Sequence, residues 1–191
     1  MNRLRRLGFK WRAILQLVFG RRRAAMRDLR AMLDEFPGDA YALASIAHLQ
    51  AEAGASRDAL ATLEQLLQVQ ADDGAHWFNY GFLLEADDRY EDAEAAFRRA
   101  VELRPSLDRA WYGVGLVLIR LGRLDEAADA LRRNTQLQPM SPYGWYQLAR
   151  VHVDRREPEE AVRIIRHLQQ FEPKVAGQLE RETGLLVSPA S

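Results

Sequence analysis

The sequence predicts an all-α protein built as a solenoid of antiparallel helix pairs. Trp77, Trp111 and Trp145 recur at a constant 34-residue spacing, and Leu43 lies one such step before the first of them. A small residue follows each of these four positions after four residues, an alanine follows after 16, and a proline follows each tryptophan after 28. These residues are Ala47, Gly81, Gly115 and Ala149; Ala59, Ala93, Ala127 and Ala161; and Pro105, Pro139 and Pro173. A fixed period of this kind is typical of stacked-repeat architectures.

The block 74–107 shows what one period contains. Two apolar stripes with helical spacing predict two helices that each bury one face. The stripes are formed by Trp77, Tyr80, Gly81 and Leu84, and by Ala93, Phe97, Ala100 and Val101. The polar run Asp87-Asp88-Arg89 between them predicts a turn, and Gly81 and Ala93 are small because the two backbones must approach closely. Pro105 ends the second helix, since proline has no backbone N–H to donate.

Local signals at helix starts support the same pattern. Ser141 before Pro142 predicts an N-cap followed by a first-turn proline. Pro158 predicts the start of the second helix of that repeat, and acidic residues follow it, as suits a helix N-terminus. Ser56 is a candidate cap for the second helix of the earlier block.

The period divides the chain into three parts. Residues 1–39 form a basic amphipathic segment and a degenerate first helix pair, in which Phe9, Ala13, Ala25, Leu29, Met32 and Pro37 fall on the same spacing. Four repeats follow at 40–73, 74–107, 108–141 and 142–175. Residues 176–191 form a capping helix and a frayed tail. We expect the helix from Val175 to Glu182, including Leu179, and the tail at Ser188–Ser191. Solenoid ends need such polar caps, because a terminal repeat has a neighbour on one side only.

Charge is distributed unevenly along the chain. The formal net charge is zero, but residues 1–30 hold ten basic residues and one acidic residue, Asp28, so a head of +9 precedes a body of −9. The absence of cysteine excludes a disulfide framework and any thiolate chemistry. An acidic body would repel phosphates, which argues against nucleic-acid binding.

The N-terminal head carries an apolar helical stripe, formed by Leu4, Leu7, Trp11, Ile14, Leu15 and Val18. Basic residues flank it, which is typical of a helix that lies on a membrane surface. The alternative, which the period favours, is that this helix belongs to the first helix pair and packs on residues 22–36. The apolar run Ala13–Phe19 is too short to span a bilayer. Export is disfavoured, because Arg21-Arg22-Arg23 follows the run directly and no small-residue cleavage site precedes it.

The residues that recur with the 34-residue period resemble the tetratricopeptide repeat family, in its bacterial type. The family pattern has Trp, Leu, Gly and Tyr on a first helix, then Ala, Phe, Ala and a final Pro on a second. Its best copy here comprises Trp77, Tyr80, Gly81, Leu84, Ala93, Phe97, Ala100 and Pro105. The next copies depart at Asn134 and His152, and the earliest has Ala71 where proline is expected. The resemblance implies a right-handed superhelix with a concave surface, and a non-catalytic adaptor or assembly scaffold as the function.

In that family, a peptide or helix is held by first-helix residues that face the concave groove. The corresponding residues here are Tyr41, His48, Phe78, Asn79, Phe82, Arg109, Tyr112, Leu116, Tyr146 and Arg150. The aromatic position shared by Phe78, Tyr112 and Tyr146 favours packing between neighbouring helices. Phe82 and Leu116 stand where the family often has a polar residue, so they indicate either a docking site or inter-repeat packing.

A chaperone-tail clamp, which another branch of the family uses, is incomplete in this chain. Asn79 and Arg109 match clamp positions, but Ala44, His48 and Gly113 replace the other clamp residues. Recognition of a chaperone tail is therefore disfavoured. The partner implied by the resemblance is a protein or peptide of another kind.

No catalytic or cofactor motif is present in the sequence. The four histidines lie in separate repeats, and the carboxylate run after Leu84 lacks the spacing of a calcium loop. We therefore expect no enzyme activity, cofactor or metal.

We expect a cytoplasmic protein, with a peripheral position at the inner membrane as the alternative. Because Leu4, Leu7, Trp11 and Ile14 lack a covering repeat, we also expect a weak homodimer in which a basic head meets an acidic body.

Overall fold

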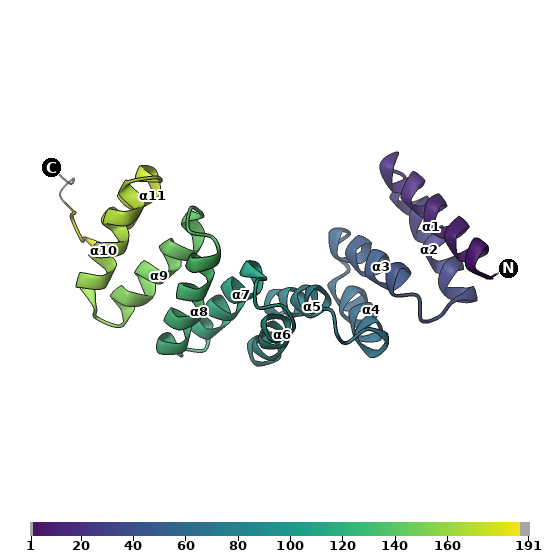
Figure 1. The fold of residues 1–191 in the computed structure, drawn as a ribbon, viewed down its shortest axis with the longest axis horizontal. Coiled ribbons are helices and arrows are strands. Elements are labelled where there is room, and N and C mark those ends of the chain that lie inside the picture. Colours follow the sequence, from purple (N-terminus) through teal and green to yellow (C-terminus); the bar gives the residue numbers. More distant parts are fainter. Residues whose placement is uncertain (1, 188–191) are drawn as a thin grey trace.

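The computed structural model describes residues 2–187, which form an arch of helices without any strand in that range (Figure 1). The helices are α1 (Asn2–Val18), α2 (Arg22–Glu35), α3 (Ala40–Glu52), α4 (Ser56–Val69), α5 (Gly74–Ala86), α6 (Tyr90–Leu103), α7 (Asp108–Arg120), α8 (Leu124–Leu137), α9 (Pro142–Asp154), α10 (Pro158–Gln169) and α11 (Pro173–Thr183). The predicted tail at Ser188–Ser191 lies outside the described residues. Between residues 2 and 187, no helix has the length and apolar character that crossing a membrane requires.

Each helix packs on the helices next to it in sequence, so the molecule is a row of antiparallel pairs. The first helices of successive pairs also contact one another, α5 with α7 and α7 with α9. Figure 1 shows α3, α5 and α7 toward the inner side of the arch and α4 and α6 along its outer side. The predicted all-α solenoid of helix pairs is confirmed.

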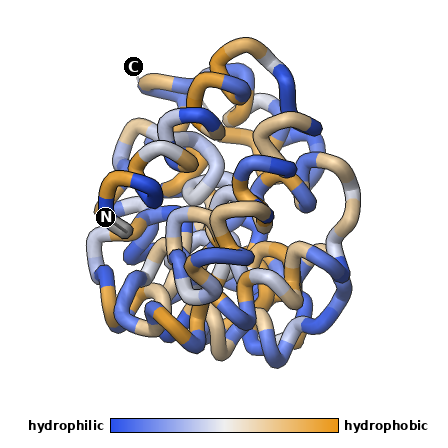
Figure 2. The backbone as a smooth tube through the Cα atoms, turned by 90° about the vertical axis from the view of Figure 1, so that its right-hand side faces the viewer, coloured by the Kyte–Doolittle hydropathy of each residue, from blue (hydrophilic) through white to orange (hydrophobic). Residues whose placement is uncertain are grey.

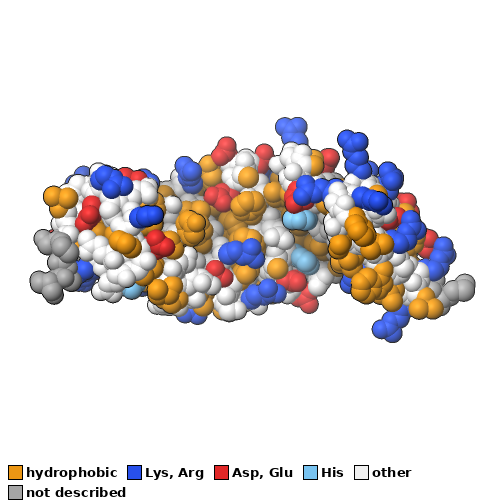
Figure 3. Space-filling view, turned by 90° about the horizontal axis from the view of Figure 1, so that it is seen from above, with side chains coloured by type: hydrophobic (Ala, Val, Ile, Leu, Met, Phe, Trp, Pro, Cys, Tyr) orange, Lys and Arg blue, Asp and Glu red, His pale blue; other side chains and the backbone are white. Residues whose placement is uncertain are grey.

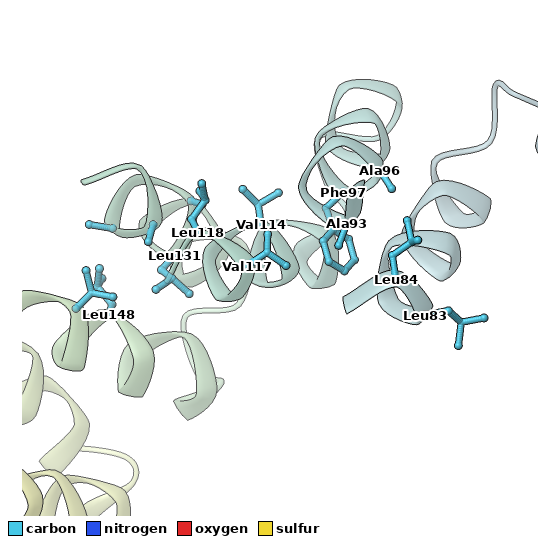
Figure 4. Packing of buried hydrophobic residues seen from close by; sticks show 14 of the residues in the cluster. Leu83, Leu84, Ala93, Ala96, Phe97, Val114, Val117, Leu118, Leu131 and Leu148 are labelled. Atoms are coloured by element: carbon cyan, nitrogen blue, oxygen red, sulfur yellow. The ribbon is translucent and has the colours of Figure 1, made fainter. Parts of the chain in front are cut away.

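One core cluster runs from α3 to the C-terminal end, and a second joins α1 and α2 to α3. Seen from the N-terminal end, hydrophobic and hydrophilic stretches alternate along the tube in Figure 2, as amphipathic helices require. The four alanines that recur at the start of each second helix are all fully buried. Figure 4 shows Leu84, Phe97, Val114, Leu131 and Leu148 following one another through successive helices. Burial of this core stabilises units that could not fold alone.

The packing of the Phe97 ring requires glycine at two neighbouring positions. Its ring is 1% exposed, and a Cβ added to Gly81 or Gly113 would lie within 2.9 Å and 2.8 Å of it, respectively. The Phe97 ring of α6 is therefore enclosed between glycines of α5 and α7. A larger residue in place of either glycine would push the helices apart.

The recurring tryptophans fasten each pair to the preceding turn. The indole Nε1 of Trp111 donates to the carbonyl oxygen of Pro105 at 2.9 Å, and that of Trp145 to Pro139 at 2.8 Å. Trp77 makes the same bond to Ala71 at 2.8 Å. The bond uses only the backbone carbonyl of the acceptor residue. Ala71 can therefore accept it at the position where proline was expected.

Helix starts agree in part with the sequence. Pro142 and Pro158 are the first residues of α9 and α10, as predicted. Ser141 is the N-cap residue of α9, as predicted, although its side chain makes no capping hydrogen bond. Ser56 does not cap α4, because it is already the first residue of that helix. Carboxylates cap two of the first helices, α3 and α5, and that of Asp39 accepts from the backbone N–H of Ala42 at 2.9 Å.

At the N-terminal end, α1 packs on α2, as the period favoured. The contact face consists of Phe9, Ala13 and Leu17, and it is not the apolar stripe. The stripe faces outward except at Ile14, which is half-buried, and Leu4 and Trp11 are 77% and 61% exposed. At the other end, α11 buries Ala176 and Leu179 against the last pair.

Candidate functional site: the concave groove

The concave face is the hollow side of the arch. Figure 3 looks into it from above and shows hydrophobic side chains in its middle, with charged side chains around them. The groove is formed by α3, α5, α7 and α9, because the second helices lie on the outer side. Three separate pockets lie along it, and nine of the ten predicted residues line one of them.

The first pocket, between α3 and α5, has a volume of about 410 Å³. It brings together five of the predicted residues, namely His48, Phe78, Asn79, Phe82 and Arg109. Its remaining wall is apolar and includes Ala44, Ala47, Ala51, Leu63 and Leu83. Three alanines on one face of α3 leave the space that larger side chains would fill.

Phe82 is the exposed apolar group of this pocket. It is 56% exposed, and its ring centroid lies 6.5 Å from that of Phe78. Phe78 is itself half-buried and lies 5.8 Å from the core residue Phe97, so it does pack between helices, as its position in the repeat favours. Phe82 therefore extends an aromatic row from the core into the groove.

Arg109 supplies a positive charge beside this row. Its guanidinium lies 5.0 Å above the Phe78 ring, which fixes it by a cation–π contact. None of the ion pairs found within residues 2–187 involves Arg109. The pocket thus combines the exposed cation of Arg109 with the exposed aromatic ring of Phe82.

The second pocket, of about 220 Å³, is polar. Leu116 and Arg150 line it together with Glu85, Arg120 and Asp154, among others. Burial raises the pKa of the Glu85 carboxyl, and the nearby positive charge of Arg120 lowers it in part. Leu116 is half-buried and lines this pocket, whereas Phe82 lines the first one.

The third pocket lies at the C-terminal end and has a volume of about 470 Å³. It contains Tyr112, Tyr146 and the exposed Tyr143. Burial raises the pKa of the Tyr112 hydroxyl. The Tyr146 hydroxyl donates to Glu182 of α11 at 2.5 Å, and this bond to a carboxylate is the main reason that its pKa is raised.

Tyr41 lies apart from the three pockets, with the Nζ of Lys10 4.5 Å from its ring centroid. The sequence did not single out Arg120 and Asp154, which end α7 and α9. A weak signal was available, because both stand at the same place in the 34-residue period.

The incomplete clamp has a structural explanation. Asn79, Arg109 and His48 do meet in one pocket. Gly113, which stands where a basic clamp residue would be, is packed against the Phe97 ring and leaves no room for a longer side chain. Across residues 2–187, no three His, Asp or Glu side chains are grouped so that they could hold a metal ion.

Comparison with solved structures finds the same fold in other proteins. The crystal structure of MamA superposes with a TM-score of 0.82 at 18% identity and covers 96% of this chain and 98% of that one. MamA from Desulfovibrio magneticus RS-1 gives 0.78 at 19% identity, with 93% and 96% covered. YrrB, described as a TPR protein with an unusual peptide-binding site, gives 0.79 at 19%, with 88% of each chain covered.

No curated protein matches the chain in sequence. A family model described as the tetratricopeptide repeat matches residues 45–108 and 83–142, which together span more than half of the chain. The helix pairs, the 34-residue period and this match agree, and the chain belongs to the tetratricopeptide repeat family.

Proposed function

We propose that the protein is a non-catalytic scaffold that binds a short segment of a protein partner in its concave groove. The observation that carries this proposal is the first pocket, which is lined by both the exposed ring of Phe82 and the guanidinium of Arg109. Soluble proteins seldom expose large apolar side chains in a concave surface unless something docks there. The described peptide-binding site of YrrB, which shares the fold, adds support.

The pocket suggests which residues the partner supplies. An apolar side chain of the partner would contact Phe82 and the alanines of α3, and a carboxylate next to it would reach Arg109. The charged second pocket, with Arg150 and Asp154, would fix the direction of the bound segment through polar contacts. Binding would thus combine an apolar anchor with charge recognition, as peptide grooves commonly do.

The test uses a displayed random peptide library, selected on the wild-type protein alone. We expect the surviving peptides to pair an aromatic or aliphatic residue with an acidic one. Fluorescence anisotropy should show binding at least about tenfold weaker to Phe82→Asp, because an apolar anchor is lost. Leu116→Asp tests in the same way whether the segment extends into the second pocket.

Two controls make this result specific. Val69→Asp introduces the same charge at a site that is 51% exposed and lies outside the three pockets, so it should leave binding unchanged. Arg109→Glu should weaken binding, and a peptide whose acidic residue is changed to lysine should regain it. Peptides that bind wild type and Phe82→Asp equally, with both variants helical by circular dichroism, would place the interface elsewhere.

A further inference from the structure

Helix α1 has two apolar faces on opposite sides. Phe9, Ala13 and Leu17 pack on the neighbouring helices. On the other side lies an outer strip, which we define as Leu4, Leu7, Trp11, Leu15, Val18 and Phe19; each of these is between 48% and 77% exposed. A helix that is apolar on both faces normally has both faces covered.

The period shows what the outer strip corresponds to in the other repeats. Leu15 lies one 34-residue step before Leu49, and the same step leads on to Leu83, Val117 and Val151. These four residues are at most 7% exposed, whereas Leu15 is 57% exposed. Each later first helix packs on the second helix before it, and nothing within residues 2–187 covers α1 in that way. At Leu15, therefore, the strip includes a helix-packing position that is left open within the described residues.

The charge around the strip is of one sign. No acidic residue occurs before Asp28, and basic residues lie along both sides of the strip and in the turn that follows it. Arg5, Arg12 and Arg22 form ion pairs with Glu35, Asp28 and Glu52, respectively. No ion pair within the described part of the chain involves Arg3, Arg21 or Arg23, which are exposed. Figure 3 shows the resulting apolar patch at the N-terminal end, with Lys and Arg side chains near it.

We propose that the outer strip and the adjoining arginines dock the protein on the surface of an anionic lipid membrane. Leucines and a tryptophan flanked by cations are the side chains that interfacial helices insert between lipid headgroups. The negative surface potential of such a membrane complements Arg3, Arg21 and Arg23. Helix α1 lies at the end of the arch, so a flat surface can reach the strip (Figure 1). Contact between two strips would bring two basic heads together, which disfavours head-to-head pairing of two copies at this face.

This site is independent of the groove, so the two proposals can fail separately. The test is sedimentation of the full chain with phosphatidylcholine vesicles, either pure or with about a third phosphatidylglycerol, at low and high salt. We expect binding to the anionic vesicles only, and weaker binding as salt is raised, because salt screens the arginines. Trp11→Asp/Leu15→Asp should reduce partitioning at least about tenfold. Phe82→Asp, a matched change at a 56% exposed apolar residue in the groove, should bind as wild type does.

Two further measurements use milder changes. Tryptophan emission should shift to the blue with anionic vesicles in wild type, and this shift should be smaller in Trp11→Phe, which keeps an aromatic ring on the strip. Arg3→Glu/Arg21→Glu/Arg23→Glu should weaken binding and its salt dependence while the strip stays intact.

Three outcomes would overturn the proposal. The first is absence of sedimentation with anionic vesicles, and the second is equal sedimentation of wild type and Trp11→Asp/Leu15→Asp. The third is a lipid-free dimer in light scattering that Trp11→Asp/Leu15→Asp dissociates, because a second copy of the chain would then occupy the strip.

Discussion

At the residue scale, one backbone position recurs through the whole chain. Gly20, Gly54, Asp88, Gly122 and Arg156 each follow the last turn of a first helix, and each has a positive φ between 58° and 76°. They recur with the same 34-residue period, so the degenerate first pair has the same turn as the others. Glycine adopts this conformation without steric cost, whereas the Cβ of arginine is crowded by the following carbonyl.

We therefore predict that Arg156→Gly stabilises the protein and Gly122→Arg destabilises it, each by about 1 kcal/mol. A Cβ at Gly122 would meet nothing within 4 Å, so the effect comes from backbone conformation alone. Urea unfolding followed by circular dichroism measures both changes. Shifts of the same sign in the two variants would show that the turn does not control stability.

At the element scale, side-chain bonds set how α3 begins. The Asp39 carboxylate caps this helix and forms an ion pair with Arg6 of α1, so one buried group joins two helices. In the next repeat, Asp73 caps α5 by accepting from Ala75 at 2.8 Å. Arg104 lies 3.3 Å from Asp73, which shows that a cation from a neighbouring helix accompanies the cap there too.

We predict that Asp39→Ala lowers stability by about 1–3 kcal/mol, because the cap is lost and Arg6 loses its buried partner. Asp39→Asn keeps a capping oxygen but removes the charge, so its loss should be smaller. The difference between the two variants in urea unfolding then measures capping. Equal losses would assign the whole effect to the ion pair with Arg6.

At the scale of the whole molecule, stability is built from contacts between neighbouring pairs. An example is the cluster of Glu94, Arg98, Arg123 and Glu126, in which each arginine contacts both carboxylates and joins α6 to α8. These ion pairs lower the pKa of Glu126. Inner pairs have such neighbours on both sides, but α1 and α11 have them on one side only.

We predict that amide hydrogen exchange is slowest in α5 to α8 and becomes faster toward both ends. Because α11 covers one end and the strip of α1 is open, α1 should exchange faster than α11. Exchange measured by mass spectrometry on the full chain gives the order directly. Uniform protection along the chain would indicate a single cooperative unit and contradict this view.

The sequence by itself determined the repeat, the helix pairs and the buried positions. These follow from local periodicity, because each face of a helix is defined by residues three or four apart, and the 34-residue step repeats the same faces. The limits of the repeats at 40, 74, 108 and 142 stay a prediction, although α3, α5, α7 and α9 begin at or near them.

Only the tertiary structure decided how the surfaces are divided. A pocket forms only where the side chains on its opposite walls are small enough to leave space. The alanines of α3 therefore matter as much as Phe82. In the same way, buried Asn134 fits because Gly144 on the next helix has no side chain, whereas the preceding repeat has Ala100 and Ala110 at these places. The size of a side chain on one helix is therefore matched by the size of its neighbour on another helix. The 34-residue period does not predict such a pair, because both of its residues differ from those of the other repeats. The stripe on α1 was visible in the sequence, but its outward direction followed only from the packing of its opposite face.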